Sequence, residues 1–426
     1  MGLVINNGRV IDPSSELDKR CNLYIDELSG RFVGVGRKPT GFKASQTIDA
    51  DGLVVCPGLV DLRAHLGLPH TTNKAGFENE TLAAVAGGVT TLCLPPDTHP
   101  VIDNAAMALM VQEHAQALGR CRIHPLGALT VNLDGEQITE FATLAQAGCV
   151  GLSNAHRTIK NTLVLRRAFQ YAHTFGLTVF INPQDPWLRG NGVMHEGETS
   201  TRLGLPAIPD AAETVDVARI LSLIETTGAR VHFSQLSSAR SVDMISDARL
   251  DGLPVTADVA IHHLHLIDQD INLLNTHCHV LPPLRDQRDR EGLRKGLSQG
   301  TLGAICSDHQ PVGSDAKLTP FASSAPGISS LEHLLPLVLK LVEEGVIDLH
   351  TALSRLTIEP AQMLGIEDGR ISTGTLADLC LFDMDAEWTL DPSGMVSGGQ
   401  NTPFSGWPLR GRVTRTVISG ESVFQL

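Results

Sequence analysis

Pro57-Gly58-Leu59-Val60-Asp61-Leu62-Arg63-Ala64-His65-Leu66 is the stretch of the chain that says most about its fold. An apolar run ends in two polar side chains, Arg63 and His65, two residues apart. Side chains alternate between the faces of a strand, so this spacing places both at one side of the strand's C-terminal end. Two histidines at that spacing would form a metal-binding pair, but arginine stays protonated and has no lone pair for a cation. The stretch therefore predicts a buried strand with an incomplete metal motif.

The centre of the chain alternates apolar strands with helical stretches. Val89 to Leu94 is a predicted strand, and Ala105 to Leu118 is the helix that follows it. Further predicted strands are Arg122 to Leu129, Cys149 to Ser153, Leu177 to Asn182, Arg230 to Gln235, Val255 to Val259 and Leu302 to Ser307. With 55 to 61 they make eight, which predicts an α/β fold of the (β/α)₈ TIM-barrel type. Functional side chains in that fold lie at the C-terminal strand ends.

The two ends of the chain contain short β-rich runs separated by turn residues, such as Leu3 to Ile5 and Gly411 to Ile418. Chain termini often lie close together, so we expect both ends to share one small sheet domain. The predicted division is a small β-sandwich domain formed by 1–54 and 370–426, and a barrel formed by 55–369.

Composition narrows the class of protein. The chain has 426 residues, with 33 Lys plus Arg against 47 Asp plus Glu and a net charge of -14, which argues against nucleic acid or an anionic membrane as a partner. Its eight cysteines form no C-x-x-C pair, which is typical of reduced, buried thiols. No apolar run is long enough to cross a bilayer, and the N-terminus lacks a signal-peptide pattern. We expect a soluble, cytoplasmic protein.

Several longer segments resemble one family from end to end. They are Pro57 to Asp61, Ala86-Gly87-Gly88-Val89-Thr90-Thr91, Ser307-Asp308-His309, Leu356 to Ala361, Gly374 to Leu379 and Asn401-Thr402-Pro403-Phe404-Ser405-Gly406-Trp407. With these segments the chain resembles the dihydroorotase branch of the amidohydrolase superfamily. The resemblance implies the same barrel and small β domain.

The resemblance also implies a zinc site that this chain lacks in large part. Active members hold zinc with two His on the first strand, a carboxylated Lys or an Asp on the fourth, His on the fifth and sixth, and Asp on the eighth. The matching positions here are Arg63, His65, Asn154, Asn182, Gln235 and Asp308. Only His65 and Asp308 retain the family's residue types, whereas a catalytic zinc normally takes three protein ligands. We expect these positions to be vestigial, with no metal or other cofactor bound.

The substrate-binding positions differ from the family pattern as well. Gly67 stands where active relatives carry an arginine for the substrate carboxylate, and Pro95 to Pro100 replaces the family's Pro-Asn-Thr-Asn-Pro loop. We assign Gly67 and His309 to a vestigial substrate site. The sequence-based expectation is a degenerate homologue that is not an enzyme and has no catalytic residues.

Arg63 and Asp308 suggest a replacement for the metal. A lone carboxylate at a buried barrel mouth would be costly, and a guanidinium in the former metal cavity would neutralise it. We therefore expect an ion pair between these two side chains. Asn182 and Gln235 are expected to keep neighbouring buried polar groups hydrogen bonded.

Two other kinds of site stay open. His262-His263-Leu264-His265 and His277-Cys278-His279 are dense in metal-binding side chains and could form a relocated metal site if they converge. Nucleophilic catalysis with Asp308, His309 and a serine is the weaker idea, because the chain has no nucleophile-elbow motif.

The resemblance finally suggests a role. Some bacterial dihydroorotase-like chains with the same loss of ligands are non-catalytic subunits that assemble with catalytic chains of aspartate carbamoyltransferase in pyrimidine biosynthesis. This implies a hetero-oligomer, six chains of each kind, with this chain as its scaffold. Two alternatives are an active dihydroorotase- or hydantoinase-type amidohydrolase with a reduced metal site around His65 and Asp308, and a sensor that binds a small molecule in the barrel mouth.

Overall fold

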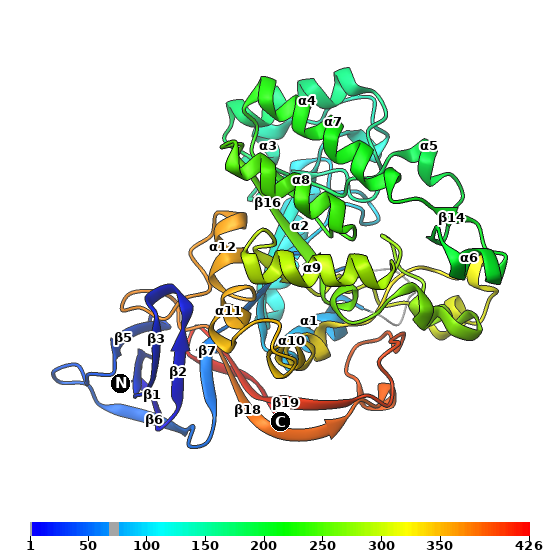
Figure 1. The fold of residues 1–426 in the computed structure, drawn as a ribbon. Coiled ribbons are helices and arrows are strands. Elements are labelled where there is room, and N and C mark those ends of the chain that lie inside the picture. Colours follow the sequence, from blue (N-terminus) through cyan, green and yellow to red (C-terminus); the bar gives the residue numbers. More distant parts are fainter. Residues whose placement is uncertain (1, 68–75) are drawn as a thin grey trace.

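The computed structural model describes residues 2–67 and 76–426, and its centre is a parallel eight-stranded barrel (Figure 1). The strands follow one another in chain order around the sheet. They are β8 (Leu59–Asp61), β9 (Val89–Leu94), β10 (Arg122–Ala128), β11 (Gly151–Ser153), β12 (Thr178–Ile181), β15 (Val231–Phe233), β16 (Val255–Ala260) and β17 (Ala304–Cys306). The predicted (β/α)₈ fold is confirmed.

The barrel closes between its first and last strands just beyond their C-terminal ends. Ala64 and His309 form a parallel bridge there, and the His65 amide donates to the His309 carbonyl at 2.8 Å. At the end of β8, the buried Asp61 carboxylate accepts hydrogen bonds from the backbone N–H of Ser307, at 2.8 Å, and from the Ser307 hydroxyl. Burial raises the pKa of Asp61 to about 6. Side chains therefore complete a seam that the short strands leave open.

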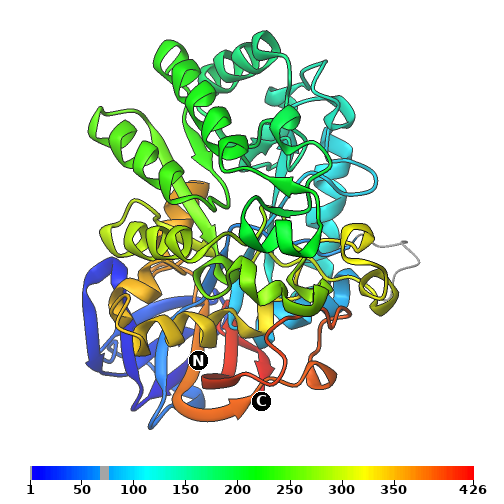
Figure 2. The same ribbon diagram turned by 45° about the vertical axis from the view of Figure 1, so that its right-hand side comes forward.

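Helices cover the outside of the barrel, because each βα unit turns an apolar helix face toward the sheet. Two views show them around the strands (Figures 1 and 2). They are α1 (Phe77–Ala86), α2 (Ala105–Leu118), α3 (Phe141–Gln146), α4 (Thr162–Thr174), α7 (Ala211–Thr227), α8 (Ala239–Leu250), α9 (Gln287–Gln299), α10 (Leu334–Glu343), α11 (Leu349–Ser354) and α12 (Ile358–Leu364). Ala361 and Leu364 of α12 join a buried cluster of strand residues that includes Val60 and Phe180.

Both ends of the chain lie in two sheets beside the barrel (Figures 1 and 2). One sheet is ordered β5-β4-β1-β6 and the other β20-β19-β18-β7-β2-β3. Their strands are β1 (Gly2–Asn6), β2 (Arg9–Asp12), β3 (Leu17–Arg20), β4 (Leu23–Asp26), β5 (Arg31–Val35), β6 (Ala44–Asp49), β7 (Val54–Pro57), β18 (Leu379–Thr389), β19 (Pro408–Ile418) and β20 (Glu421–Gln425). A core cluster joins residues of both ends, among them Leu3, Ile25, Leu381 and Val417. The domain boundaries at 54 and 370 stay a prediction.

The predicted strand 55–61 is divided in two. Residues before Gly58 form β7 in the terminal sheet, where they pair with β18 and β2, and residues after it form β8 in the barrel. Gly58 is required here because a Cβ atom would lie 2.1 Å from the Thr90 hydroxyl oxygen. This single residue therefore marks the passage from one sheet to the other.

The other departures from the predicted elements follow from exposed or irregular segments. β3 and β6 were not predicted, since their side chains are mostly exposed and polar and show no apolar alternation. The 183–210 segment between β12 and α7, which we call the insertion because it separates a barrel strand from the next long helix, was also missed. It contains α5 (Pro186–Arg189), β13 (Met194–His195), α6 (Glu198–Leu203) and β14 (Ala207–Ile208).

The cysteines behave as predicted. All eight are free, and all except the half-buried Cys21 are buried. Within 2–67 and 76–426, the structure contains no helix with the length and hydropathy needed to span a bilayer.

Replacing Gly58 by alanine tests its role at the junction of the two sheets. The added methyl group would overlap the Thr90 side chain, and overpacking of a rigid core costs about 1–3 kcal/mol. We expect the free energy of unfolding in urea to fall by that amount. Gly394→Ala is the matched control, because open space surrounds its Cβ position, and it should leave stability unchanged. Equal stability of the two variants would contradict this account.

Candidate functional site

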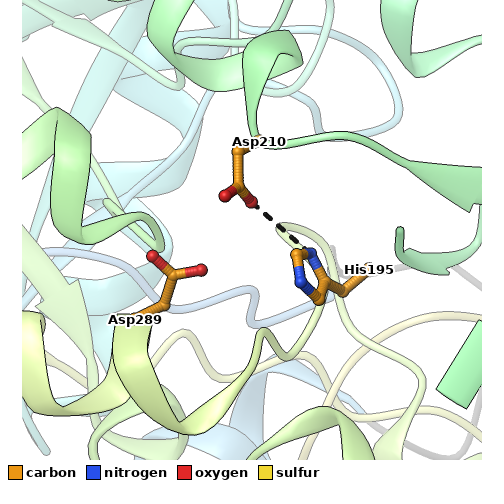
Figure 3. Close-up of side chains that lie close together, drawn as sticks. All are labelled: His195, Asp210 and Asp289. Atoms are coloured by element: carbon orange, nitrogen blue, oxygen red, sulfur yellow. Dashed lines mark ion pairs between the residues drawn. The ribbon is translucent and has the colours of Figure 1, made fainter. Parts of the chain in front are cut away.

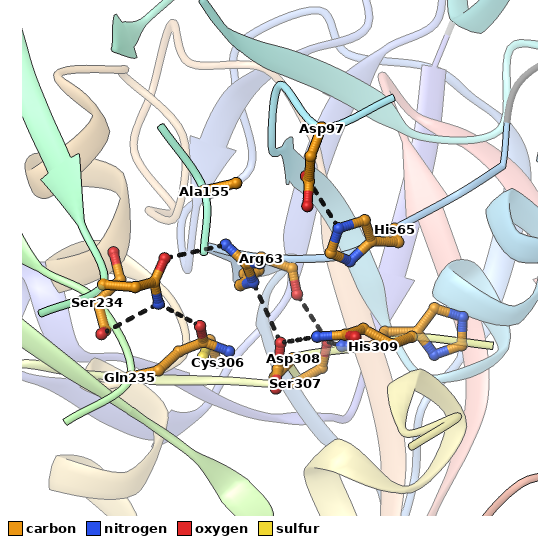
Figure 4. A network of polar contacts seen from close by, with 12 residues as sticks. Arg63, His65, Asp97, Ala155, Ser234, Gln235, Cys306, Ser307, Asp308 and His309 are labelled. Carbon is orange, nitrogen blue, oxygen red and sulfur yellow. Dashed lines mark hydrogen bonds and ion pairs between the residues drawn. The ribbon is translucent and has the colours of Figure 1, made fainter. Parts of the chain in front are cut away.

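Two groups of polar side chains are candidate sites, one in the 183–210 insertion and its neighbours (Figure 3) and one at the strand ends (Figure 4). The insertion cluster consists of His195, Asp210 and Asp289, whose ligand atoms lie within 4.8 Å of one another. The strand-end network consists of Arg63, His65, Asp97, Asn182, Gln235 and Asp308. The sequence predicted most of the second group and none of the first.

Arg63 and Asp308 form the expected ion pair across the barrel seam (Figure 4). The Arg63 Nε donates to Asp308 Oδ1 at 3.1 Å, and the side chains are 6% and 1% exposed. Gln310 Nε2 donates to the same oxygen at 2.9 Å. Burial raises the pKa of Asp308, although the Arg63 charge and the Gln310 hydrogen bond act to lower it. The ion pair is therefore confirmed.

Asn182 and Gln235 extend the network to the neighbouring strands. Arg63 Nη1 donates to Asn182 Oδ1 at 3.4 Å, and Asn182 Nδ2 donates to Gln235 Oε1. The backbone N–H of Gln235 donates to Asp258 Oδ1 at 2.6 Å, with Gln235 in the left-handed region at φ 57°. Asn182 keeps its buried neighbours hydrogen bonded, as expected of this substitution, whereas Gln235 Nε2 is buried without a hydrogen-bond partner among the described residues.

Asn154 does not join this network. Its Oδ1 accepts from the Thr130 hydroxyl at 2.8 Å, and its Nδ2 donates to the Arg157 carbonyl at 2.6 Å. These contacts hold the loop after β11. Sequence position placed Asn154 at the barrel mouth correctly, but its hydrogen bonds turn it to the loop instead of to Arg63.

His65 has a partner that the sequence did not reveal. Its Nε2 lies 3.0 Å from Asp97 Oδ1, in a loop noted only for its departure from the family pattern. Burial acts to raise the pKa of Asp97, but the electrostatic attraction and hydrogen bond between Asp97 and His65 outweigh it, and the pKa of Asp97 is well below its usual range. Within the described residues, His65 Nδ1 and Arg63 Nη2 are buried without a hydrogen-bond partner.

His309 is a structural residue and does not line the mouth. Its Nε2 lies 2.7 Å from Glu80 Oε2, both side chains are fully buried, and its Nδ1 accepts the Ser330 amide at 3.0 Å. An accepting Nδ1 places the ring proton on Nε2, so the ring is fixed in one tautomer. Gly67 is exposed at φ 65° beside residues 68–75, which lie outside the described part of the chain.

The family's zinc does not fit at the strand ends. Of the six matching positions only His65 and Asp308 offer zinc-type ligands, and each already has another partner, Asp97 and Arg63 respectively. The guanidinium stands beside Asp308, where a cation would have to bind. A stable catalytic zinc needs three protein ligands from His, Cys or carboxylate.

The histidine-rich segments form no relocated metal site among the described residues. His263 Nε2 lies 3.2 Å from the Pro282 carbonyl, His265 Nε2 lies 2.9 Å from the Leu337 carbonyl, and His279 Nδ1 lies 2.9 Å from the Ser324 hydroxyl. These rings are engaged with the barrel's own loops. The group of three or more metal-binding side chains that the described residues do contain is the insertion cluster.

Comparisons with known proteins agree with the fold and the strand-end motifs. Residues 52–241 match the family model "Dihydro-orotase-like" and residues 308–424 match "Amidohydrolase family". The dihydroorotase-like protein of Pseudomonas putida is 46% identical over 420 residues, covering 99% of this chain and 98% of that protein. The dihydroorotase of Anaeromyxobacter sp. is 40% identical over 425 residues, covering 99% and 98%. The solved L-hydantoinase of Arthrobacter aurescens shares the fold, with a TM-score of 0.87, 22% identity and coverage of 99% and 96%.

The expectation that this chain is not an enzyme is wrong. Relatives named dihydroorotase match it at 40% and 38% identity along nearly their whole length, and the described residues include a group that can hold a metal ion. The expectation depended on the six family ligand positions at the strand ends and on the altered substrate-binding positions, Gly67 and the 95–100 loop. It missed Asp97 beside His65 and the whole insertion cluster.

Replacing Arg63 by methionine tests the ion pair. The change leaves Asp308 buried and unpaired, which costs about 3–5 kcal/mol at neutral pH. Loss of the guanidinium raises the pKa of Asp308 further above its unfolded value, so the native state takes up a proton more readily than the unfolded state. We therefore expect the loss of stability to be smaller at pH 5 than at pH 7.5 in urea unfolding.

The double variant Arg63→Met/Asp308→Asn is the control for this experiment. It removes both charges and should recover most of the lost stability with little dependence on pH. A single variant as stable as the wild type at pH 7.5 would show that the pair does not hold the seam.

Proposed function

This chain belongs to the dihydroorotase-like family of amidohydrolases, and we propose that it hydrolyses a cyclic amide or ureide of the dihydroorotate or hydantoin class at the strand-end network. The site lacks most of the family's metal ligands, and zinc does not fit there. Its chemistry depends on the side chains of this chain alone.

The observation that carries the proposal is the pair of His65 and Asp97. Asp97 holds His65 Nε2 at 3.0 Å, and the other ring nitrogen, Nδ1, has no partner among the described residues. A carboxylate that orients one nitrogen of an imidazole leaves the second nitrogen free to accept a proton from water. The pair has the arrangement of a general base.

Arg63 supplies the second requirement of amide hydrolysis. Attack on an amide carbonyl places negative charge on its oxygen, and positioned donors stabilise that charge. Arg63 Nη2 is a buried N–H donor without a partner in the described residues, while Nε is held by Asp308 at 3.1 Å. The ion pair therefore fixes the guanidinium and leaves one of its nitrogens for a ligand.

The proposed reaction balances without a further reactant. Water forms a bond to the ring carbonyl carbon and gives one proton to His65 Nδ1. The C–N bond then breaks, and the proton passes to the departing nitrogen. The products, in one open-chain molecule, are an N–H group and a carboxylic acid, which releases its proton to solvent and becomes a carboxylate at neutral pH.

Replacing His65 by asparagine tests this function. Removing a general base lowers kcat by about 10²–10⁴-fold. We expect that loss in a spectrophotometric assay of dihydroorotate, dihydrouracil and hydantoin, with chelator-treated protein. His350→Asn is the control, because His350 is exposed and lies on α11, and it should keep full activity. Absence of turnover of all three rings by the wild type would overturn the proposal.

We propose separately that the chain assembles with an aspartate carbamoyltransferase catalytic chain. The support is the set of family ligand positions that this chain has lost, Arg63, Asn154, Asn182 and Gln235, and these positions do not specify the partner surface. Co-expression with the carbamoyltransferase chain of the same genome, followed by light scattering, should give a particle several times larger than either chain alone. Two separate peaks with the masses of the isolated proteins would contradict assembly.

A further inference from the structure

We propose that His195, Asp210 and Asp289 bind one divalent metal ion of the zinc type at a site outside the strand-end network (Figure 3). The three residues come from separate elements. His195 ends β13 in the insertion, Asp210 precedes α7, and Asp289 lies in the first turn of α9. The proposal does not rest on the function proposed above.

The spacing of the three side chains suits a single ion. Zinc binds nitrogen and oxygen ligands at about 2.0–2.2 Å, so two ligands in a tetrahedral arrangement lie about 3.4 Å apart. The three ligand atoms here lie within 4.8 Å of one another, and His195 Nδ1 is 3.5 Å from Asp210 Oδ1. Small rotations of the side chains therefore bring them to bonding distance.

Asp289 gives an independent indication of a ligand. The residue is only 5% exposed, and its Oδ1 accepts the Ala239 amide at 2.8 Å. The carboxylate is directed toward the space between His195 and Asp210 (Figure 3). Burial of a carboxylate is costly, and a cation in that space would compensate it.

Arg285 is the competing cation. Its Nη1 donates to Asp210 Oδ1 at 2.7 Å and lies 3.5 Å from His195 Nδ1, but the guanidinium is also held by Ser237 Oγ at 2.7 Å and by Glu213 Oε2 at 3.4 Å. Asp210 has a side chain that is 46% exposed, so it can turn toward an ion while Arg285 keeps its buried partners. Two carboxylates, Asp210 and Glu213, contact this guanidinium, and Asp289 is a third carboxylate in the same cluster, which leaves excess negative charge for a divalent ion.

The donor set selects the type of metal. One imidazole nitrogen and two carboxylate oxygens are ligands that zinc accepts in three-ligand sites with an open position for water. Magnesium and calcium prefer oxygen ligands throughout. We therefore expect zinc to bind more tightly than magnesium or calcium.

Metal titration of the full-length chain tests the proposal. Protein stripped with chelator is titrated with Zn²⁺ against a chromophoric chelator, and metal content is measured by mass spectrometry. We expect one tightly bound Zn²⁺ per chain, with at least tenfold weaker binding in His195→Ala and in Asp289→Asn. Asp243→Asn on α8 and His350→Ala on α11 are exposed matched controls and should bind zinc like the wild type.

Two further measurements keep the result decisive. Cobalt binding to the wild type should give visible absorption bands that Asp289→Asn lacks, and circular dichroism checks that each variant is folded. Should His195→Ala fail to fold, the isosteric Asp289→Asn carries the test. A wild type that binds no zinc, or triad variants that bind it as tightly as the controls, would overturn the proposal. Neither result depends on ring hydrolysis, which is measured separately on the stripped protein.

Discussion

The seam between β8 and β17 is the constraint on which the barrel and its mouth depend. Seven of the eight strand junctions are backbone ladders, but this one has only the bridge between Ala64 and His309. Two buried side-chain contacts support it, Asp61 with Ser307 and Arg63 with Asp308. Arg63 and Asp308 thus stand at two of the family's metal-ligand positions, but here their contact closes the sheet.

This use of Arg63 explains the arrangement of the rest of the mouth. A guanidinium committed to Asp308 and Asn182 fills the place of an ion and satisfies the carboxylate that would otherwise be buried alone. His65 is then free of any metal role and pairs with Asp97 instead. A base and a cationic donor, both with an unpartnered nitrogen in the described part of the chain, stand on one strand end as a result.

Sequence patterns located the barrel well because its strands are apolar and evenly spaced. The 89–94 strand and the 105–118 helix have their predicted bounds, and Arg63 and Asp308 meet as expected. The break at Gly58 escaped notice because the clash with Thr90 is a contact between strands. The hydrogen-bond partners of Asn154 and Asp97 were not predicted for a similar reason, since position on a strand end or in a loop fixes neither the rotamer nor the partner of a side chain.

The insertion cluster shows why a count of family positions was a poor measure of what this chain can do. Those positions lie on strand ends. Hydrogen bonds between the strands fix the direction of their side chains there, and Arg63 excludes a metal ion. His195, Asp210 and Asp289 instead lie in the insertion and at the starts of α7 and α9, so the change at the seam places no restriction on them. Their separation in sequence, at 195, 210 and 289, leaves no spacing motif to detect. Only the folded chain brings them together, and it does so at a place where negative charge exceeds what Arg285 can neutralise.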